Sequence, residues 1–504
     1  MNLAISHTRA TVGMQSRLVT VEVHLSNGLP GFTIVGLPQT AVKESKDRVR
    51  SAILNSHFEF PCRRITVNLA PADLPKIGSG FDLPIAIGIL AASGQLPLSK
   101  LDQHEFIGEL ALNGSLRGVP SVMPMLIAAK ASASTIIIAA ANAPEASLID
   151  YSGVLYAENL RAVHQYLYHG QALASPPASL SLKKEPQYAD DWSDIKGQAH
   201  AKSALKIAAC GGHNILLYGP PGSGKTMLAK RLVTILPALT EAQALECATI
   251  QSVYGRITEA ENWQRPAFRA PHHSASSIAL VGGGNPPKPG EISLAHHGVL
   301  FLDELPEFQR KVLETLREPL ESGHICISRA AIQIEFPAQF QLIAAMNPCP
   351  CGQLGNPHAE CFCTQDVIRR YHHKLSGPFL DRIDLHINVP TLPLETLISA
   401  PASQPKESPL LRTEIAKVRA LQIQRQGCIN AVLNTANCNQ FCALSESEQQ
   451  FLHTTLSQLK LSARSYYRLL KVARTIADIR HAPNIERSDL QQALAFKACF
   501  STQS

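Results

Sequence analysis

The segment that most constrains the fold is residues 214–232, in which a short apolar run leads into a glycine-rich loop and then into a helix-like run. Its centre, GPPGSGKT, matches the pattern GxxxxGK[ST]. Glycines let successive backbone N–H groups turn toward a phosphate, and the start of the next helix adds partial positive charge. A glycine loop formed by chance is the alternative, but the flanking strand and helix argue against it. We predict a phosphate-binding loop made of Gly219, Pro220, Pro221, Gly222, Ser223, Gly224, Lys225 and Thr226.

A pair of acids about 80 residues further on completes this site. The run GVLFL is typical of a buried strand, and it ends at Asp303 and Glu304. The carboxyl ends of parallel strands meet at one edge of a sheet, so we expect both acids beside the loop. Lys225 would reach the β- and γ-phosphates, Thr226 and Asp303 would hold Mg²⁺, and Glu304 would polarise the attacking water. An acidic pair alone is more often an ordinary turn, but with the loop it predicts ATP hydrolysis.

The sequence divides into three parts joined by two linkers. Residues 1–170 alternate strand-like runs with a helix and predict an α+β domain. Residues 192–392 place short apolar strands between helices, the pattern of a parallel α/β sheet covered on both faces. Residues 410–504 have apolar residues at helical spacing and predict a helical lid. The stretches 171–191 and 393–409, rich in Pro, Ser and Ala, are expected to be linkers.

Composition points to a cytoplasmic protein. The 504 residues contain no apolar run of about 18, and the N-terminus lacks the pattern of a secretory signal, so no membrane association is expected. The net charge is +6, and residues 405–504 account for all of it with 13 Lys and Arg against 7 Asp and Glu. A basic module suits a polyanionic partner, and a solvated helical surface is the alternative.

Four cysteines follow the last strand-like run in the spacing CxC, nine residues, CxC. They are Cys349, Cys351, Cys361 and Cys363. Four thiolates within 15 residues predict a tetrahedral structural Zn²⁺ site, with reduced, metal-free thiols as the alternative. His358 is a substitute ligand in this interpretation, although a loop histidine is more often simply exposed.

Several longer motifs carry a family resemblance, among them DIKGQ, FRAPHHSAS, AAMNPCPCG, LSGPFLDRIDLH and SARSYYRLLKVARTIAD. Residues 192–392 resemble the AAA+ ATPases of the magnesium-chelatase type, and the whole chain resembles the bacterial ComM/YifB proteins. The resemblance implies an adenine-side loop, an asparagine that senses the γ-phosphate, an arginine finger and an arginine sensor in the lid. These roles fall on Gly197 and Gln198, Asn347, Arg382, and Arg464, respectively.

The resemblance also implies a function. It predicts a homo-oligomer, most simply a hexamer, because an arginine finger comes from the neighbouring subunit. It further predicts a bacterial cytoplasmic helicase that uses ATP to drive branch migration on single-stranded and branched DNA during natural transformation. The alternative is a chelatase-type motor that remodels a protein partner. Without the motif, Arg382 would be interpreted as a salt bridge to Asp381 or Asp384.

Two segments of the ATPase part are expected to project toward DNA. The family carries an insertion that here spans residues 268–297, where prolines and glycines favour a stiff lever. Alternating apolar residues predict a β-hairpin over 325–337 with its tip at 329–331. Lys288 and Arg329 would then contact phosphates without reading bases. A solvent-facing Arg329 is the alternative.

The first domain resembles the proteolytic domain of Lon-type proteases, through PKIGSGFD and GELALNGSLRG. In that alignment Gly80 stands where the nucleophilic serine belongs, Ser79 lies one position early, and Met123 replaces the lysine. We therefore predict a catalytically inactive domain and interpret Lys76 as a surface charge rather than a base. An ATP-dependent protease that uses Ser79 is the alternative. In the lid, Arg464, Arg468 and Lys471 share one helical face and are expected to meet nucleotide, phosphate or a neighbouring subunit, or simply solvent.

Overall fold

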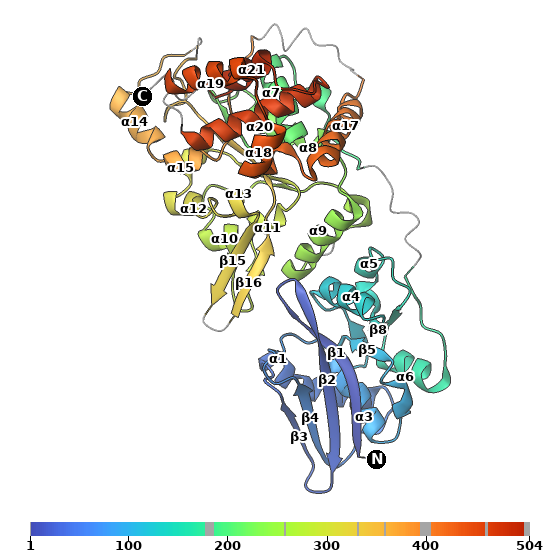
Figure 1. Cartoon of the computed structure of the whole chain (residues 1–504). Coiled ribbons are helices and arrows are strands. Elements are labelled where there is room, and N and C mark those ends of the chain that lie inside the picture. Colours follow the sequence, from blue (N-terminus) through green and yellow to red (C-terminus); the bar gives the residue numbers. More distant parts are fainter. Residues whose placement is uncertain are drawn as a thin grey trace.

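The computed structural model describes residues 2–176, 186–256, 259–329, 332–356, 359–393, 405–458 and 462–497. Three regions follow one another along the molecule, with the N-terminal sheet at one end and the C-terminal helices at the other (Figure 1). Residues 177–185 of the first predicted linker and 394–404 of the second lie outside the described residues. The mixed α/β architecture confirms the predicted fold class.

The N-terminal region contains a seven-stranded mixed sheet in the order β3-β4-β2-β1-β5-β8-β9. Helix α3 is buried along its whole length, because its eleven residues include one charged side chain, Asp82, which pairs with Arg48 at 2.7 Å. The strands are β1 (Leu3–Val12), β2 (Gln15–Ser26), β3 (Gly31–Val35), β4 (Arg64–Ala70), β5 (His104–Ile107), β8 (Thr135–Ala139) and β9 (Val154–Ala157), with a small pair β6 (Glu109–Leu110) and β7 (Leu116–Arg117). The helices are α1 (Thr40–Lys43), α2 (Ser45–Asn55), α3 (Asp82–Ala92), α4 (Val122–Ala131), α5 (Ala143–Ala146) and α6 (Leu160–His169).

The central region is built on five parallel strands in the order β11-β14-β17-β10-β18. Strands β14, β17 and β10 are apolar and buried at nearly every position, as expected for a sheet covered on both faces. The strands are β10 (Ile215–Tyr218), β11 (Phe268–Arg269), β14 (Val299–Leu302), β17 (Gln341–Met346) and β18 (Leu385–Asn388). The main helices are α7 (Ala199–Gly211), α8 (Lys225–Ile235), α9 (Glu241–Tyr254) and α14 (Gln365–His372). Shorter helices are α10 (Ser277–Val281), α11 (Glu291–Leu294), α12 (Arg310–Glu314), α13 (Pro319–Ser322) and α15 (Gly377–Leu380).

The predicted hairpin forms, as β15 (His324–Arg329) and β16 (Ile332–Pro337). Its apolar face, which includes Ile327 and Ile334, is buried, and this face meets the turn between β1 and β2 through Val12 and Met14. Figure 1 shows this meeting point between the central and N-terminal regions. The two residues at the hairpin tip lie outside the described residues.

The segment 268–297 does not project as a free lever. It folds into α10, α11 and a short pair of strands, β12 (Gly282–Gly283) and β13 (Lys288–Pro289), and Pro289 and Gly290 are buried. Lys288 is exposed. The backbone of Leu280 lies so close to Gly290 that a Cβ there would come within 2.3 Å of the Leu280 carbonyl oxygen, which explains the glycine.

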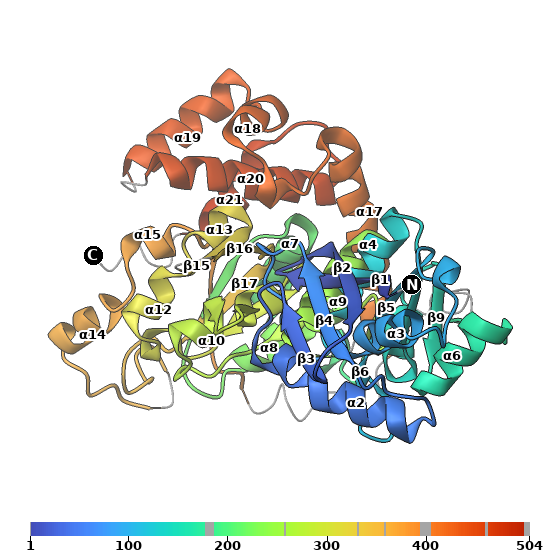
Figure 2. The ribbon, with the colours of Figure 1, turned by 90° about the horizontal axis from the view of Figure 1, so that it is seen from below.

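The C-terminal region is helical, as predicted, and forms one side of the molecule in Figure 2. Its first helix begins at Ser408, two residues earlier than the predicted start of the lid at residue 410. The helices are α17 (Ser408–Gln426), α18 (Thr435–Phe441), α19 (Glu446–Gln458), α20 (Ala463–Ile479) and α21 (Arg487–Ala495). Apolar side chains of α17 and α20 share one core with α7 and α8, so the lid packs directly on the parallel sheet region.

Much of the lid's basic charge is used inside the chain. Arg468 bonds Asp384 at 2.6 Å and the carbonyl of Arg382 at 2.7 Å, while Lys471 donates to the Ala431 carbonyl at 3.1 Å. Both side chains are half-buried and have partners inside the chain, which the helical spacing did not predict. Their contact with phosphate or with a neighbouring subunit stays a prediction. The Arg468 guanidinium and other donors hold the pKa of buried Asp384 well below its usual range, although burial by itself would raise it.

Candidate nucleotide-binding site

The phosphate loop connects β10 to α8, as the motif predicts. Gly219 has no room for a side chain, since a Cβ would lie 2.1 Å from the Val389 carbonyl oxygen. Gly222 and Gly224 adopt positive φ angles of 74° and 91°, which other residues rarely tolerate. Nothing lies within 4 Å of the Cβ position of Gly222, so that side of the loop is open to a ligand.

Lys225 links the loop to the predicted sensor asparagine. Its Nζ donates to the Gly219 carbonyl at 2.7 Å, to the Pro220 carbonyl at 2.8 Å, and to Asn347 Oδ1 at 3.2 Å. Asn347 directly follows β17, the strand between β10 and β14. Burial lowers the pKa of Lys225, partly offset by nearby Asp303. A γ-phosphate bound here would have an ammonium group and an uncharged amide as neighbours.

The expected magnesium ligands also come together. Thr226 donates through Oγ1 to Asp303 Oδ2 at 2.7 Å. A hydroxyl and a carboxylate are the hard oxygen donors that Mg²⁺ takes in nucleotide sites, alongside phosphate oxygens and waters. The two residues therefore fit the ion, which when bound would neutralise phosphate charge.

Glu304 lies next to this pair in a strained position. Its φ angle of 52° places it in the left-handed region, and its side chain is 54% exposed. His273 approaches it, with Nδ1 3.1 Å from Glu304 Oε2. His273 belongs to the FRAPHHSAS motif, from which no role for it was predicted; only the fold reveals this contact.

The adenine-side loop touches the phosphate loop. Gly197 and Gln198 both have positive φ angles, 54° and 50°. The Gln198 amide donates to the Pro390 carbonyl at 2.7 Å and to the Ser223 carbonyl at 3.4 Å. Their adenine-side role stays a prediction, but the loop lies beside the predicted phosphate site.

The two predicted functional arginines meet on one carboxylate. The Nη2 atoms of Arg382 and Arg464 lie 2.8 Å and 3.0 Å, respectively, from Glu321 Oε1. Arg382 is buried, its side chain 5% exposed, and also donates to the carbonyls of Arg317 and Pro378, whereas Arg464 is 46% exposed. The alternative of a surface ion pair between Arg382 and Asp381 or Asp384 is wrong, since the partner is Glu321. The finger and sensor roles stay predictions.

The four cysteines form a compact cluster. Their Sγ atoms all lie within 4.8 Å of one another, with three of the separations at 3.3 to 3.6 Å. Tetrahedral zinc with Zn–S of about 2.3 Å requires sulfurs about 3.8 Å apart, so the thiols suit the ion closely. The Leu354 N–H points at Cys349 Sγ at 3.4 Å, as N–H groups often do toward thiolates. His358 lies outside the described residues.

The cysteine loop also packs on the phosphate loop. Gly352, with a φ of 78°, lies so close to Pro221 that a Cβ would be 2.7 Å from its ring. Asn347, which bonds Lys225, is two residues before Cys349. A metal bound by the thiols would therefore stabilise both the backbone that touches the phosphate loop and the start of the sensor turn.

A second cluster was not foreseen. Glu246 Oε2 lies 3.1 Å from His296 Nε2 and 2.8 Å from His297 Nε2. The Gln339 N–H donates to Nδ1 of His296, so Nε2 of that ring carries the hydrogen and donates to Glu246. A metal at Nε2 would need the other tautomer. The cluster is therefore a set of hydrogen bonds that joins α9 to the turn before β14, and burial lowers the pKa of His296 to about 4.

The remaining predicted residues lie away from the phosphate site. Ser79 donates to Glu109, and Lys76 is fully buried and donates to the Pro71 carbonyl, so Lys76 is not the surface charge that was expected. Burial lowers the pKa of Lys76. No hydrogen bond joins Ser79 to Lys76 within the described chain, and Met123 is buried. The side chain of Arg329 lies outside what the structure describes.

Comparisons with known proteins show the family to which the chain belongs. Residues 191–397 match the family described as magnesium chelatase, subunit ChlI, residues 21–142 match subunit ChlI of Mg-chelatase, and residues 405–497 match the ChlI C-terminal family. Competence protein ComM of Haemophilus influenzae is 53% identical over 504 residues, covering 99% of this chain and 98% of that protein. The chain belongs to the ComM/YifB family.

Other members and a more distant relative place the ComM/YifB family among the chelatase-type AAA+ proteins. YifB of Escherichia coli strain K12, an uncharacterized protein, is 50% identical over 498 residues, covering 99% of this chain and 97% of that protein. The magnesium-chelatase 38 kDa subunit of Cereibacter sphaeroides is 24% identical over 177 residues, 31% of this chain and 52% of that protein. Membership implies ATPase activity with ATP and Mg²⁺. No helix in the described residues is long and apolar enough to cross a membrane.

Proposed function

We propose that this chain is a hexameric AAA+ motor that uses ATP to move single-stranded and branched DNA, driving branch migration during homologous recombination in natural transformation. The observation that carries the proposal is the similarity to a competence protein along the whole chain, N-terminal region included. The assembled contacts among Lys225, Asn347, Thr226 and Asp303 supply the ATPase part. We place the motor in the bacterial cytoplasm.

The proposal predicts that DNA stimulates ATP hydrolysis. Phosphate contacts without base readout suit an enzyme that must accept any sequence, and such contacts weaken as salt rises. Single-stranded DNA or a four-way junction should raise the ATPase rate at low salt, and the affinity should fall steadily with salt concentration. Strand exchange on the junction should require ATP. Turnover that is indifferent to every DNA at low salt would argue against the motor.

The hexamer makes a separate prediction about Arg382. If each site joins the phosphate loop of one protomer to the arginine of the next, Lys225→Ala and Arg382→Ala chains should each be inactive alone and regain activity when mixed. In an equal mixture, about a quarter of the sites in a ring of heterologous interfaces would combine an intact Lys225 with an intact Arg382 from the next protomer. Arg382 would have to leave Glu321 to act in this way. No recovery on mixing, with both variants folded, would refute the shared site.

We propose structural zinc as the occupant of the four-cysteine cluster. Purified protein should hold one zinc per chain by elemental analysis, and Cys361→Ser should lose the metal together with most ATPase activity, because Gly352 packs on the phosphate loop. Cys62→Ser, an exposed thiol outside the cluster, is the control and should change neither. Full activity after complete metal removal would contradict this role.

The second candidate is a chelatase-type motor that remodels a protein partner. It is favoured by the family matches, all three of which bear the name of a chelatase subunit. A dedicated protein partner recovered with the chain, together with no retention of DNA at low salt, would support this candidate over the DNA motor.

A further inference from the structure

An aromatic side chain stands unusually exposed on the four-cysteine loop. Phe362, between Cys361 and Cys363, is 85% exposed, more than any other Phe, Tyr or Trp in the described residues. Leaving a phenylalanine ring in water forgoes the free energy of its burial. The thiol cluster on both sides restricts the backbone at this position, so the ring is presented rather than folded away.

A helix with exposed basic residues begins three residues after this ring in the chain. Helix α14 starts at Gln365 and exposes Arg369 and Arg370, neither of which has an ion-pair partner within the described part of the chain. The helix borders a hollow of about 420 Å³. The hollow is lined by Pro306, Glu307, Phe308, Arg310, Arg370, His373 and Lys374. Its one carboxylate, on Glu307, lies 3.3 Å from Lys374 Nζ, so the remaining charge is positive.

The surface lies at the periphery and yet next to the nucleotide site. Both ribbon views place α14 at the outer edge of the central region, away from the N-terminal sheet (Figures 1 and 2). Two lining residues, Pro306 and Glu307, belong to the short helix Leu305–Glu307, which begins directly after Glu304. His372 of α14 also contacts the carbonyl of Pro348, one residue beyond Asn347. A ligand held here would touch the turn after Glu304 and the helix whose His372 contacts the turn after Asn347.

We propose that this α14 surface binds a single strand of DNA. The ring of Phe362 stacks on a base, which any of the four bases allows, and the cations neutralise phosphates. A single strand is the partner that needs both an apolar face and a row of positive charges. The inference rests on the proposed DNA motor and names a contact site for it. The surface consists of Phe362, Arg310, Arg369, Arg370, His373 and Lys374.

The test separates stacking from charge in the full-length chain. Affinity is measured by fluorescence anisotropy with a non-hydrolysable ATP analogue, using an oligothymidine and an abasic oligonucleotide of equal length. Phe362→Ala should weaken binding of the oligothymidine about fivefold or more and leave the abasic strand unchanged. The double variant Arg369→Ala, Arg370→Ala should weaken binding of both strands and reduce the dependence on salt.

Two matched controls lie in the N-terminal region. Tyr168→Ala removes another exposed ring, and Arg63→Ala with Arg64→Ala removes another adjacent pair of exposed arginines. Zinc content and basal ATPase rate should match wild type in all variants. Three results would each overturn the α14 surface. The control variants could lose as much DNA affinity as the α14 variants, or the α14 variants could keep the wild-type DNA affinity. The α14 variants could also lose the oligomer while the molecules that still assemble bind DNA as tightly as wild type. If the wild type itself binds no DNA at low salt, the proposed motor fails as well.

Discussion

Replacing Glu304 with glutamine is expected to lower ATP turnover by about 100-fold or more while nucleotide stays bound. The amide keeps the size of the side chain but cannot accept a proton from water. Lys225 remains in place, and so do Thr226 and Asp303, whose side chains contact each other at 2.7 Å. The phosphates and Mg²⁺ therefore keep their ligands. Steady-state ATPase assays measure turnover, and a fluorescent ATP analogue measures binding.

Lys225→Ala is the matched comparison for this experiment. Its Nζ interacts with the loop carbonyls and Asn347, so removing it should weaken nucleotide binding as well as turnover. The two variants should therefore separate into a bound but inactive protein and a poorly bound one. If Glu304→Gln hydrolysed ATP at a rate close to wild type, the glutamate would have no part in polarising water.

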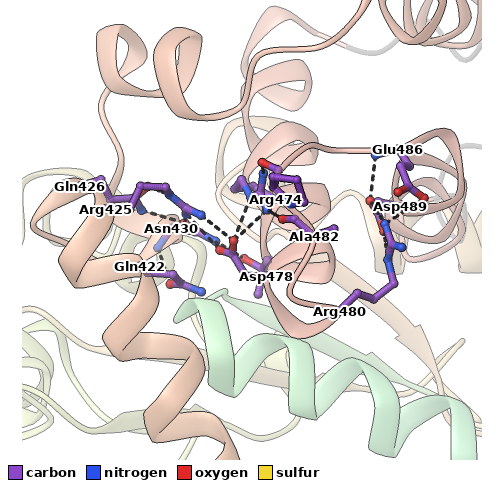
Figure 3. Close-up of polar contacts among 12 residues, drawn as sticks. Gln422, Arg425, Gln426, Asn430, Arg474, Asp478, Arg480, Ala482, Glu486 and Asp489 are labelled. Carbon is purple, nitrogen blue, oxygen red and sulfur yellow. Dashed lines mark hydrogen bonds and ion pairs between the residues drawn. The ribbon is translucent and has the colours of Figure 1, made fainter.

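Replacing Asp478 with alanine is expected to cost about 3–5 kcal/mol of stability, chiefly in the lid. The Asp478 carboxylate is 3% exposed and bonds Arg425 at 2.6 Å and 3.0 Å, Arg474 at 3.0 Å, and the amide of Asn430 at 2.8 Å. Figure 3 shows these donors converging on it from two separate segments. Its removal would leave the buried guanidinium of Arg474 without its countercharge.

Urea unfolding followed by circular dichroism measures this loss, and hydrogen exchange in α20 locates it. The control is Glu414→Ala, which breaks an exposed ion pair with Lys206 on the neighbouring helix α7. Exposed pairs contribute about 0–1 kcal/mol, so that variant should unfold nearly as wild type does. Equal stability of the two variants would mean that the buried network is not a principal support of the lid.

The nucleotide site could be predicted from sequence because its geometry is local or follows from sheet topology. The loop from Gly219 to Thr226 specifies its own backbone shape, and apolar runs of four to six residues predict buried strands. Parallel strands bring their carboxyl ends to one edge, so Asp303 and Asn347 had to lie near Lys225. The contacts Thr226–Asp303 and Lys225–Asn347 agree with that expectation.

The contacts that the basic side chains make could not be predicted in this way. Helical spacing placed Arg464, Arg468 and Lys471 on one face but did not say what that face would meet. The structure buries part of it against the sheet region, so that Arg468 finds Asp384, 84 residues away in the chain. Lys76 was expected at the surface because a charged residue in a loop is usually solvated, but the fold buries it.

The sequence by itself determined the chemistry of the phosphate loop, the acidic pair, the cysteine spacing and the order of the three regions, because each depends on residues close together in the chain. Only the tertiary structure decided that Arg382 and Arg464 share Glu321, that the cysteine loop rests on Pro221, and that Phe362 stands beside a basic helix. Such partnerships depend on how helices and turns dock. Docking is set by the shape and burial of surfaces assembled from distant segments, which periodicity along one segment does not encode.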